Sequence, residues 1–209
     1  MNDASAEARE TFLSFFKDPQ TKRSGFEGQL DPGFQGLAAA AHSGVSVEEC
    51  HSYHTLDLPG GRVVEGAWDL RAGVHDYLGR LDYAGLRVLE FGPATGFLGF
   101  TMEAWGAEVT AFEIAPFLSQ DLVPGDGESA ANTLASTVDF SGRIRNSWWY
   151  GRREIRSGIR VVYGDIYRLP RDMGRCDVST FGAILLHLKS PYLALEQAAG
   201  HTDRAIVVT

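Results

Sequence analysis

The sequence predicts an α/β protein in which a mostly parallel sheet carries helices on both faces, preceded by an N-terminal cap. Three observations lead to this fold class. From about residue 86 onward, short apolar strand-like runs alternate with segments of helical periodicity. The first of these runs ends in the glycine-containing stretch "EFGPATG". Before residue 83 the pattern differs, because amphipathic helical segments are followed by a single alternating hairpin pattern.

Composition limits the classes of function open to this chain of 209 residues. Hydrophobic residues make up 44% and charged residues 22%, the balance of a globular protein with one substantial core. The formal net charge of −8 counts against a large nucleic-acid footprint and leaves room only for a local basic patch.

The cysteines and the N-terminal segment favour a reduced, cytoplasmic compartment. Cys50 and Cys176 are the only cysteines and lie far apart in the sequence, so no disulfide framework is expected. The start, "MNDASAEARE", lacks the basic and apolar regions of a signal peptide. No apolar run approaches the ~18 residues of a membrane-spanning helix, so we expect no membrane span.

Residues 1–82 are expected to form a cap of helices and a hairpin. Residues 4–16 have the pattern of an amphipathic helix, and "GFQGLAAAAH" (33–42) that of a second helix. The segments "YHTLDL" (53–58) and "RVVEG" (62–66) alternate in polarity around Pro59-Gly60-Gly61, which predicts a β-hairpin. Apolar residues at helical spacing in "WDLRAGVHDYLGRL" predict a helix over 68–81.

Residues 83–209 are expected to form a Rossmann-like domain, because strands and helices alternate there. The predicted strands are 86–91, 107–114, 159–165, 176–182 and 204–209. Helices are predicted over 97–105 and 190–199, with a long, mostly helical insert at about 127–157. Ser190 followed by Pro191 is a favourable start for the last helix. Short apolar strands of this kind indicate a parallel sheet that is covered on both faces.

The loop after the first predicted strand is a candidate ligand site. In doubly wound sheets, ligands bind at the carboxyl ends of the strands, where the strand order reverses. Gly92 and Gly96 permit a tight turn, and the helix that starts after Gly96 offers unpaired N–H groups and its positive dipole end. The alternative is a plain glycine-rich turn between a strand and a helix.

Three acidic residues at successive strand ends strengthen the prediction of a nucleoside site. Glu90 lies at the end of the first strand, and Glu113 at the end of the second, where a carboxylate can accept hydrogen bonds from both ribose hydroxyls. Asp165 closes the third strand, in reach of an adenine amino group or a backbone N–H. Each acid alone is explained by solvation or helix capping.

The loop favours a zwitterionic ligand over a dinucleotide. A diphosphate is typically bound by G-x-G-x-x-G, and here Ala94 replaces the middle glycine. Glu90 would stand close to the phosphates, where a carboxylate is unfavourable, whereas it is well placed for a methionine ammonium. S-adenosylmethionine is therefore the expected cofactor, and a nicotinamide dinucleotide remains the alternative.

Four segments resemble, in order, the motifs of class I S-adenosylmethionine-dependent methyltransferases: "VLEFGPATG", "VTAFEIA", "GDIYRLP" and "CDVSTFGAILLHLKSPYLAL". The resemblance covers about residues 66–209. The stretches "YHTLDLPGGRVVEGAWDLR" and "LLHLKSP" are similar to a bacterial branch related to enzymes that modify the wobble uridine of tRNA.

The resemblance implies a set of cofactor-binding residues. The methionine portion would be held by the first motif, the ribose by Glu113 and the adenine by Asp165 with Ile166. The full set that follows from these motifs is Glu90, Gly92, Pro93, Ala94, Gly96, Glu113, Ile114, Asp165 and Ile166.

The resemblance also implies that the C-terminal strands of the full methyltransferase sheet are absent. Members of the family continue past "AIVVT" through a helix and an antiparallel hairpin, whereas this sequence ends at Thr209. The expectation is that the chain is a fragment, or that the exposed edge strand is covered by another segment or by a partner, for example in a homo-oligomer.

His187, just past the fourth strand of the domain, is the candidate catalytic base. Methyl transfer is an in-line displacement from a reactive sulfonium, to which positioning contributes roughly 7–11 kcal/mol. A general base adds about 10²–10⁴-fold, so it is helpful rather than indispensable. A neutral imidazole suits a hydroxyl or a ring nitrogen. The alternative is a helix-capping or core histidine.

Two segments supply candidate acceptor-binding residues. Tyr53, Trp68 and Arg71 border the entrance of the domain and either cover the cofactor or pack. In "GRIRNSWWYGRREIRSGIR", a helical plot places Ile144, Trp148, Gly151 and Ile155 on a core face, and Arg145, Trp149, Arg152 and Arg156 on the next face. Exposed Trp149 and Arg152 would grip an anionic or aromatic acceptor or stack on nucleobases, and the alternative is a solvated arginine face without a ligand.

No metal site is expected, since Cys50, His51 and His54 are only three clustered donors and the first two point apart in an extended chain. The leading prediction is a methyltransferase that acts on a small-molecule acceptor. The alternatives are a tRNA-modifying methyltransferase and a non-catalytic cofactor-binding module.

Overall fold

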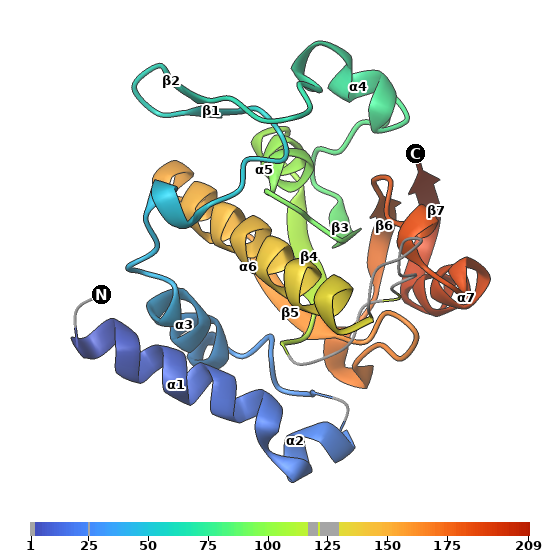
Figure 1. Ribbon diagram of the computed structural model, residues 1–209. Coiled ribbons are helices and arrows are strands. Elements are labelled where there is room, and N and C mark those ends of the chain that lie inside the picture. Colours follow the sequence, from blue (N-terminus) through green and yellow to red (C-terminus); the bar gives the residue numbers. More distant parts are fainter. Residues whose placement is uncertain (1–2, 25, 117–120, 122–129) are drawn as a thin grey trace.

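The computed structural model describes residues 3–24, 26–116, 121 and 130–209. Its main sheet has the strand order β5-β4-β3-β6-β7, and every neighbouring pair is parallel. The strands are β3 (Arg87–Phe91), β4 (Glu108–Ile114), β5 (Arg160–Gly164), β6 (Cys176–Phe181) and β7 (Thr202–Val208). The order reverses between β3 and β6, so the switch point lies at their carboxyl ends. The predicted α/β fold class is confirmed (Figure 1).

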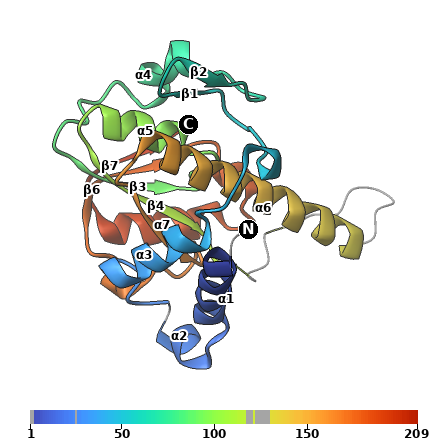
Figure 2. The ribbon, with the colours of Figure 1, turned by 90° about the vertical axis from the view of Figure 1, so that its left-hand side faces the viewer.

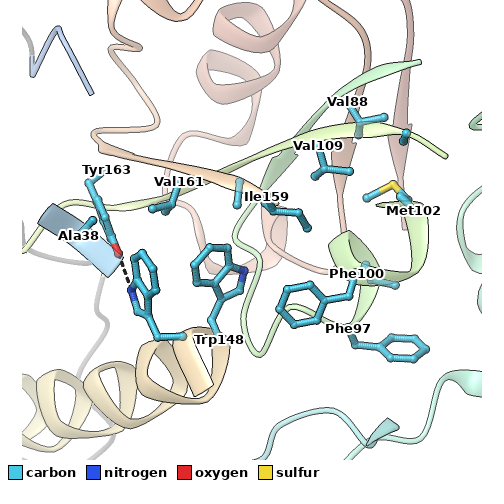
Figure 3. Close-up of a cluster of buried hydrophobic side chains, with 14 of the residues drawn as sticks. Ala38, Val88, Phe97, Phe100, Met102, Val109, Trp148, Ile159, Val161 and Tyr163 are labelled. Atoms are coloured by element: carbon cyan, nitrogen blue, oxygen red, sulfur yellow. Dashed lines mark hydrogen bonds between the residues drawn. The ribbon is translucent and has the colours of Figure 1, made fainter. Parts of the chain in front are cut away.

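Helices cover both faces of the sheet, because successive strand residues point to opposite sides. Val88 and Ala111 belong to the cluster beneath α5 (Phe97–Ala104) and α6 (Ala130–Ile155), whereas Leu89 and Phe112 pack with α7 (Pro191–His201). Figure 3 shows part of the first cluster, with Trp148 of α6 beside Ile159 and Phe100. The two clusters place β3 and β4 in the middle of the molecule.

The N-terminal helices lie beside β5 (Figure 1), and their apolar residues share a cluster with those of α6, which Figure 2 shows from a second side. They are α1 (Asp3–Lys17), α2 (Pro19–Ser24) and α3 (Pro32–Ala41). The rings of Phe12 and Phe16 each lie 5.5 Å from that of Tyr163, which anchors α1 on the sheet. The predicted helices over 4–16 and 33–42 are therefore confirmed.

Two glutamine side chains cover the outer edge of β5. The Gln29 carboxamide donates to the carbonyl of Tyr163 at 2.7 Å and accepts from its N–H at 2.8 Å. Gln35 makes the same pair of bonds with Val161, at 2.7 and 3.0 Å. Both amides thus replace a neighbouring strand, which satisfies edge groups that would otherwise invite pairing with another chain.

The hairpin prediction is confirmed by β1 (Leu56–Leu58) and β2 (Arg62–Val64), which pair antiparallel. The helix predicted over 68–81 is wrong in extent, because only the 3₁₀ turn η2 (Arg71–Gly73) and α4 (Val74–Tyr77) form. Gly79 and Arg80 adopt left-handed φ angles of 73° and 55°, which end the helix. The prediction was too long because Leu81 continues the apolar spacing beyond Gly79 and Arg80, where the backbone leaves the helix.

The long insert predicted at about 127–157 is helical over Ala130–Ile155, and residues 127–129 lie outside the described residues. Three short 3₁₀ turns complete the chain: η1 (Val47–Glu49), η3 (Arg171–Met173) and η4 (Leu185–His187). Among the described residues, no helix has the length and apolar character needed to cross a membrane.

Candidate functional site

The loop between β3 and α5 is a tight turn built from left-handed residues. Gly92, Ala94 and Gly96 have φ angles of 66°, 47° and 90°. The N–H of Gly92 donates to the carbonyl of Phe112 at 2.9 Å, and that of Gly96 to the carbonyl of Pro93 at 2.7 Å. Ala94 is strained, because a side chain in this region costs roughly 1–2 kcal/mol. The loop therefore presents backbone at the switch point of the sheet.

Packing within the chain also requires the two glycines. A Cβ on Gly96 would stand 2.4 Å from the Phe100 ring and 2.9 Å from that of Trp148. A Cβ on Gly92 would stand 2.8 Å from the side chain of Ile184. These contacts bring α5, α6 and the segment after β6 together around the loop, so glycine at these positions is not by itself a sign of a ligand.

Glu90 is buried beneath the start of α5, with 2% of its surface exposed. In the sheet it is paired with Ala111 of β4 and Thr180 of β6. Its Oε2 and the Oγ1 of Thr180 have no hydrogen-bond partner within the described part of the chain. Burial and the neighbouring charge of Glu113 raise the pKa of Glu90 to about 8, against the opposing effect of the Gly99 N–H. The site therefore contains a buried carboxyl group that would gain from a cation nearby.

Glu113 and Asp165 occupy the carboxyl ends of the next two strands. Burial raises the pKa of Glu113, and the positive charge of Arg145 on α6 opposes that shift. One oxygen of Glu113 accepts from the N–H of Ile114 at 3.0 Å. Asp165 accepts from the N–H of Tyr167 at 2.9 Å, and Ile166 packs in the cluster under α7. The three acids predicted from the sequence therefore do lie at three adjacent strand ends.

The cap contacts this loop through His54. The hydroxyl of Thr95 accepts from the main-chain N–H of His54 at 3.2 Å and lies 3.2 Å from its Nδ1. Tyr53, half-buried, packs its ring edge-on against that of His54 at 4.8 Å. The segment predicted to border the entrance therefore does reach the glycine loop.

The other two residues of this entrance group, Arg71 and Trp68, differ in how far their side chains are engaged by the cap. Arg71 is paired with Asp57 at 2.8 Å and with Asp69 at 2.6 Å, so its charge is compensated within the cap. Trp68 exposes 56% of its surface, and its main-chain N–H donates to the carbonyl of Tyr53 at 2.9 Å. Only Trp68 of this group presents a large exposed ring.

The predicted exposure of Trp149 and Arg152 is wrong. Trp149 is 3% exposed, stacks on His42 at 4.7 Å and donates its indole N–H to the hydroxyl of Tyr163 at 3.0 Å. Arg152 donates to the carbonyl of Ile159 at 2.9 Å and lies over the Trp149 ring. Both residues hold α6 to β5 and α3, because this helix is covered on two sides rather than one.

Other arginines of α6 fix the cap. Arg143 donates to the carbonyls of Glu48 and Cys50, and Arg153 to those of Ser43 and Val45. The basic character of this helix is therefore used largely within the chain.

His187 lies in η4, is exposed, and follows β6 at the carboxyl edge of the sheet. Leu186 and Tyr192 on either side of it are also exposed. The structure thus places His187 on the solvent side of the segment that follows the switch-point strand.

Sequence reasoning missed a carboxylate that joins three loops at this edge. Asp121, in the loop after β4, accepts from the hydroxyl of Tyr167 and from the N–H of Lys189 at 3.0 Å. The ammonium of Lys189 lies 3.2 Å from the same carboxylate, and the N–H of Ser190 donates to the Tyr167 hydroxyl at 3.2 Å. The loops after β4, β5 and β6 are therefore tied together by contacts that no sequence pattern signals.

Comparison with models of known protein families finds no match, and comparison with curated proteins finds none either. Solved structures with a similar arrangement include the glycopeptide N-methyltransferase MtfA, at 19% identity and a TM-score of 0.42, which covers 66% of this chain and 50% of MtfA. The chain thus spans half the length of that protein.

Two further structures are similar to this chain. The magnesium protoporphyrin IX methyltransferase ChlM from Synechocystis PCC 6803, with bound SAM, has 14% identity, a TM-score of 0.44 and coverage of 100% of this chain and 76% of its own. The amino pentose methyltransferase CalS10 from Micromonospora echinaspora has 18% identity, a TM-score of 0.41 and coverage of 66% and 48%. Likenesses at this level do not assign an activity to the chain.

Proposed function

We propose that this chain binds S-adenosylmethionine at the carboxyl edge of the sheet and transfers its methyl group to a small-molecule acceptor. The observation that carries the proposal is the buried Glu90 carboxyl group behind the glycine loop, with an oxygen that has no hydrogen-bond partner among the residues that the structure describes. A nearby cation such as the sulfonium or ammonium of S-adenosylmethionine would stabilise the ionised form of this carboxyl group, whereas a diphosphate would disfavour it. This difference favours a methyl donor over a nicotinamide dinucleotide.

The residues around the loop fit such a cofactor. Glu90 and the backbone of the loop residues Gly92, Pro93, Ala94 and Gly96 would hold the methionine portion, since the left-handed turn presents main-chain groups. Glu113, with Ile114 beside it, would accept the ribose hydroxyls. Asp165 and Ile166 would border the adenine.

The bound cofactor would supply an activated methyl group, and the protein would contribute chiefly positioning. Holding donor and acceptor in line contributes roughly 7–11 kcal/mol to such a displacement. His187, exposed after β6, is the candidate base that would accept a proton from the acceptor. Trp68 is the candidate aromatic contact for the acceptor, because its ring is exposed on the cap.

A nucleic-acid acceptor has less support than a small molecule. The tRNA alternative depends on Arg152 and Arg156 being free to contact phosphates. Arg156 is exposed, whereas Arg152 is engaged with Ile159 and Trp149, and Arg143 and Arg153 with carbonyls of the cap. A small acceptor is therefore the more consistent proposal.

Transfer of a labelled methyl group tests this function. The protein would be incubated with S-adenosylmethionine that carries an isotopically labelled methyl group, together with a panel of aromatic and anionic small molecules. We expect label in at least one acceptor and S-adenosylhomocysteine as the second product, with the rate lowered about 10²-fold or more in His187→Ala. Tight binding of S-adenosylhomocysteine without labelling of any acceptor would instead support a cofactor-binding module without catalysis.

A further inference from the structure

Thr95 lies inside the glycine loop, yet its side chain is bonded to the cap. Its hydroxyl accepts from the main-chain N–H of His54 and lies 3.2 Å from the Nδ1 of the same residue. Both side chains are buried, with 8% of His54 and 2% of Thr95 exposed. One hydroxyl therefore joins the loop between β3 and α5 to a cap residue that lies 41 positions earlier in the sequence.

The Thr95 hydroxyl can serve both contacts whichever tautomer the imidazole adopts. A hydroxyl has two lone pairs and one proton, so it can accept from the main-chain N–H of His54 and either donate to an unprotonated Nδ1 or accept from Nδ1–H. Burial lowers the pKa of His54 to about 4, which keeps the ring neutral near neutral pH. Donors and acceptors of His54 and Thr95 are then matched.

His54 is itself held in place by the return of the hairpin. A Cβ on Gly66 would stand 2.2 Å from the carbonyl carbon of His54, so the two segments are in direct backbone contact. The hydroxyl of Thr55 accepts from the N–H of Gly66 at 3.1 Å, and the N–H of Thr55 donates to the carbonyl of Trp68 at 2.9 Å. The hairpin thus presents the imidazole to the loop from a fixed backbone.

We propose that His54 is a positioning residue of the glycine loop, which holds Thr95 and so couples the order of the cofactor site to the packing of the cap on the loop. The loop needs such support, because Ala94 is in a left-handed conformation and, within the described residues, the N–H groups of Gly92 and Gly96 are held by Phe112 and Pro93 without a bond to the cap. The role assigned to the loop rests on the proposed function. The contact between cap and loop stands independently of it.

Four variants of the full chain separate positioning from plain destabilisation. His54→Phe keeps a ring against Tyr53 and Phe97 but removes Nδ1. Thr95→Val removes the hydroxyl, whereas Thr95→Ser retains it. Thr202→Val is the matched control, because its hydroxyl bonds Ala198 and Ser179 at the far end of the sheet.

Two readouts are measured on each variant: amide hydrogen exchange of residues 94–96 in the free protein, and calorimetric affinity for S-adenosylhomocysteine. We expect faster exchange and roughly tenfold weaker binding in His54→Phe and Thr95→Val. Thr95→Ser should remain within about twofold of the wild type. Thr202→Val should lower the melting temperature without changing either readout.

The outcomes distinguish this inference from the proposed function. Unchanged loop exchange in His54→Phe and Thr95→Val would overturn the positioning role. Equal effects in Thr202→Val would also overturn it, since general destabilisation would then explain them. Faster loop exchange in His54→Phe and Thr95→Val, together with a wild type that binds no S-adenosylhomocysteine, would leave the positioning role intact and refute the cofactor.

Discussion

Glu90 is buried, its Oε2 has no hydrogen-bond partner within the described ranges, and burial is the main cause that raises its pKa to about 8 from the ordinary 4.5. In the folded protein the Glu90 carboxyl group keeps its proton up to about pH 8, whereas in the unfolded chain it loses the proton near pH 4.5. The contribution of this group to the free energy of unfolding is therefore constant below pH 4.5, falls as the pH rises to about 8 and is constant above. In the absence of a cation, the carboxyl group is a stability cost at alkaline pH.

The Glu90→Gln variant tests this cost, because the amide resembles the protonated acid. We expect the variant to be more stable than the wild type by roughly 1–3 kcal/mol at about pH 9, with the difference shrinking toward about pH 5. Denaturant unfolding at both pH values measures it. A difference of the same size at both would show that Glu90 does not change its ionisation in this range.

For single residues, the sequence predicted the positions of the three acids but not the burial of Trp149 and Arg152. Glu90, Glu113 and Asp165 could be found because strand ends are readable from apolar runs. Trp149 and Arg152 could not be placed, because a helical plot gives the residues that share a face and not the number of faces that are covered. Here His42 of the N-terminal segment lies against Trp149, and Ile159 against Arg152.

Among the elements, β5 depends on side chains to finish its edge. Gln29→Leu removes two hydrogen bonds to Tyr163 and leaves its N–H and carbonyl buried without partners. We expect the free energy of unfolding to fall by about 2–4 kcal/mol, measured by denaturant unfolding. Gln20→Leu, an exposed change in α2, serves as the control and should have little effect. Equal stabilities of the two variants would refute the role of Gln29.

The loops at the carboxyl edge offer a second test at this scale. Tyr167→Phe removes the hydroxyl that accepts from the N–H of Ser190, while Asp121 still accepts from the N–H of Lys189. Amide hydrogen exchange should therefore become faster at Ser190 and change much less at Lys189. Tyr192→Phe is the control, because that ring is 87% exposed. Unchanged exchange at Ser190 would show that Tyr167 does not hold this loop.

Element boundaries show where periodicity stops being informative. The main strands and α1, α3, α5 and α7 match their predicted ranges within a few residues, since apolar pattern and capping agree there. The segment 68–81 did not, because its apolar spacing describes burial against the sheet rather than continuous helix. Left-handed backbone at Gly79 and Arg80 overrides that spacing.

In the whole molecule, an apolar cluster lies on each face of the sheet, and the acidic residues lie at the carboxyl ends of its strands. The fold class was predictable because strand and helix patterns alternate, and alternation fixes a parallel sheet with a switch point. The attachment of residues 3–66 was not, since it depends on side chains that bond distant main-chain groups: Gln29, Gln35, Arg143, Arg153 and Thr95. Contacts of this kind produce no periodic pattern in the sequence, so they could not be predicted from it.

The central claim is that the carboxyl edge of the sheet binds S-adenosylmethionine, and calorimetric titration with S-adenosylhomocysteine tests it most directly. NADH is titrated in parallel, on the wild type, on Glu113→Ala and on Glu108→Ala. The last is a matched control, because Glu108 lies at the opposite end of the same strand and pairs with Arg160. We expect micromolar binding of S-adenosylhomocysteine that Glu113→Ala weakens about tenfold or more and Glu108→Ala leaves unchanged. Binding of NADH instead, or equal losses in both variants, would contradict the claim.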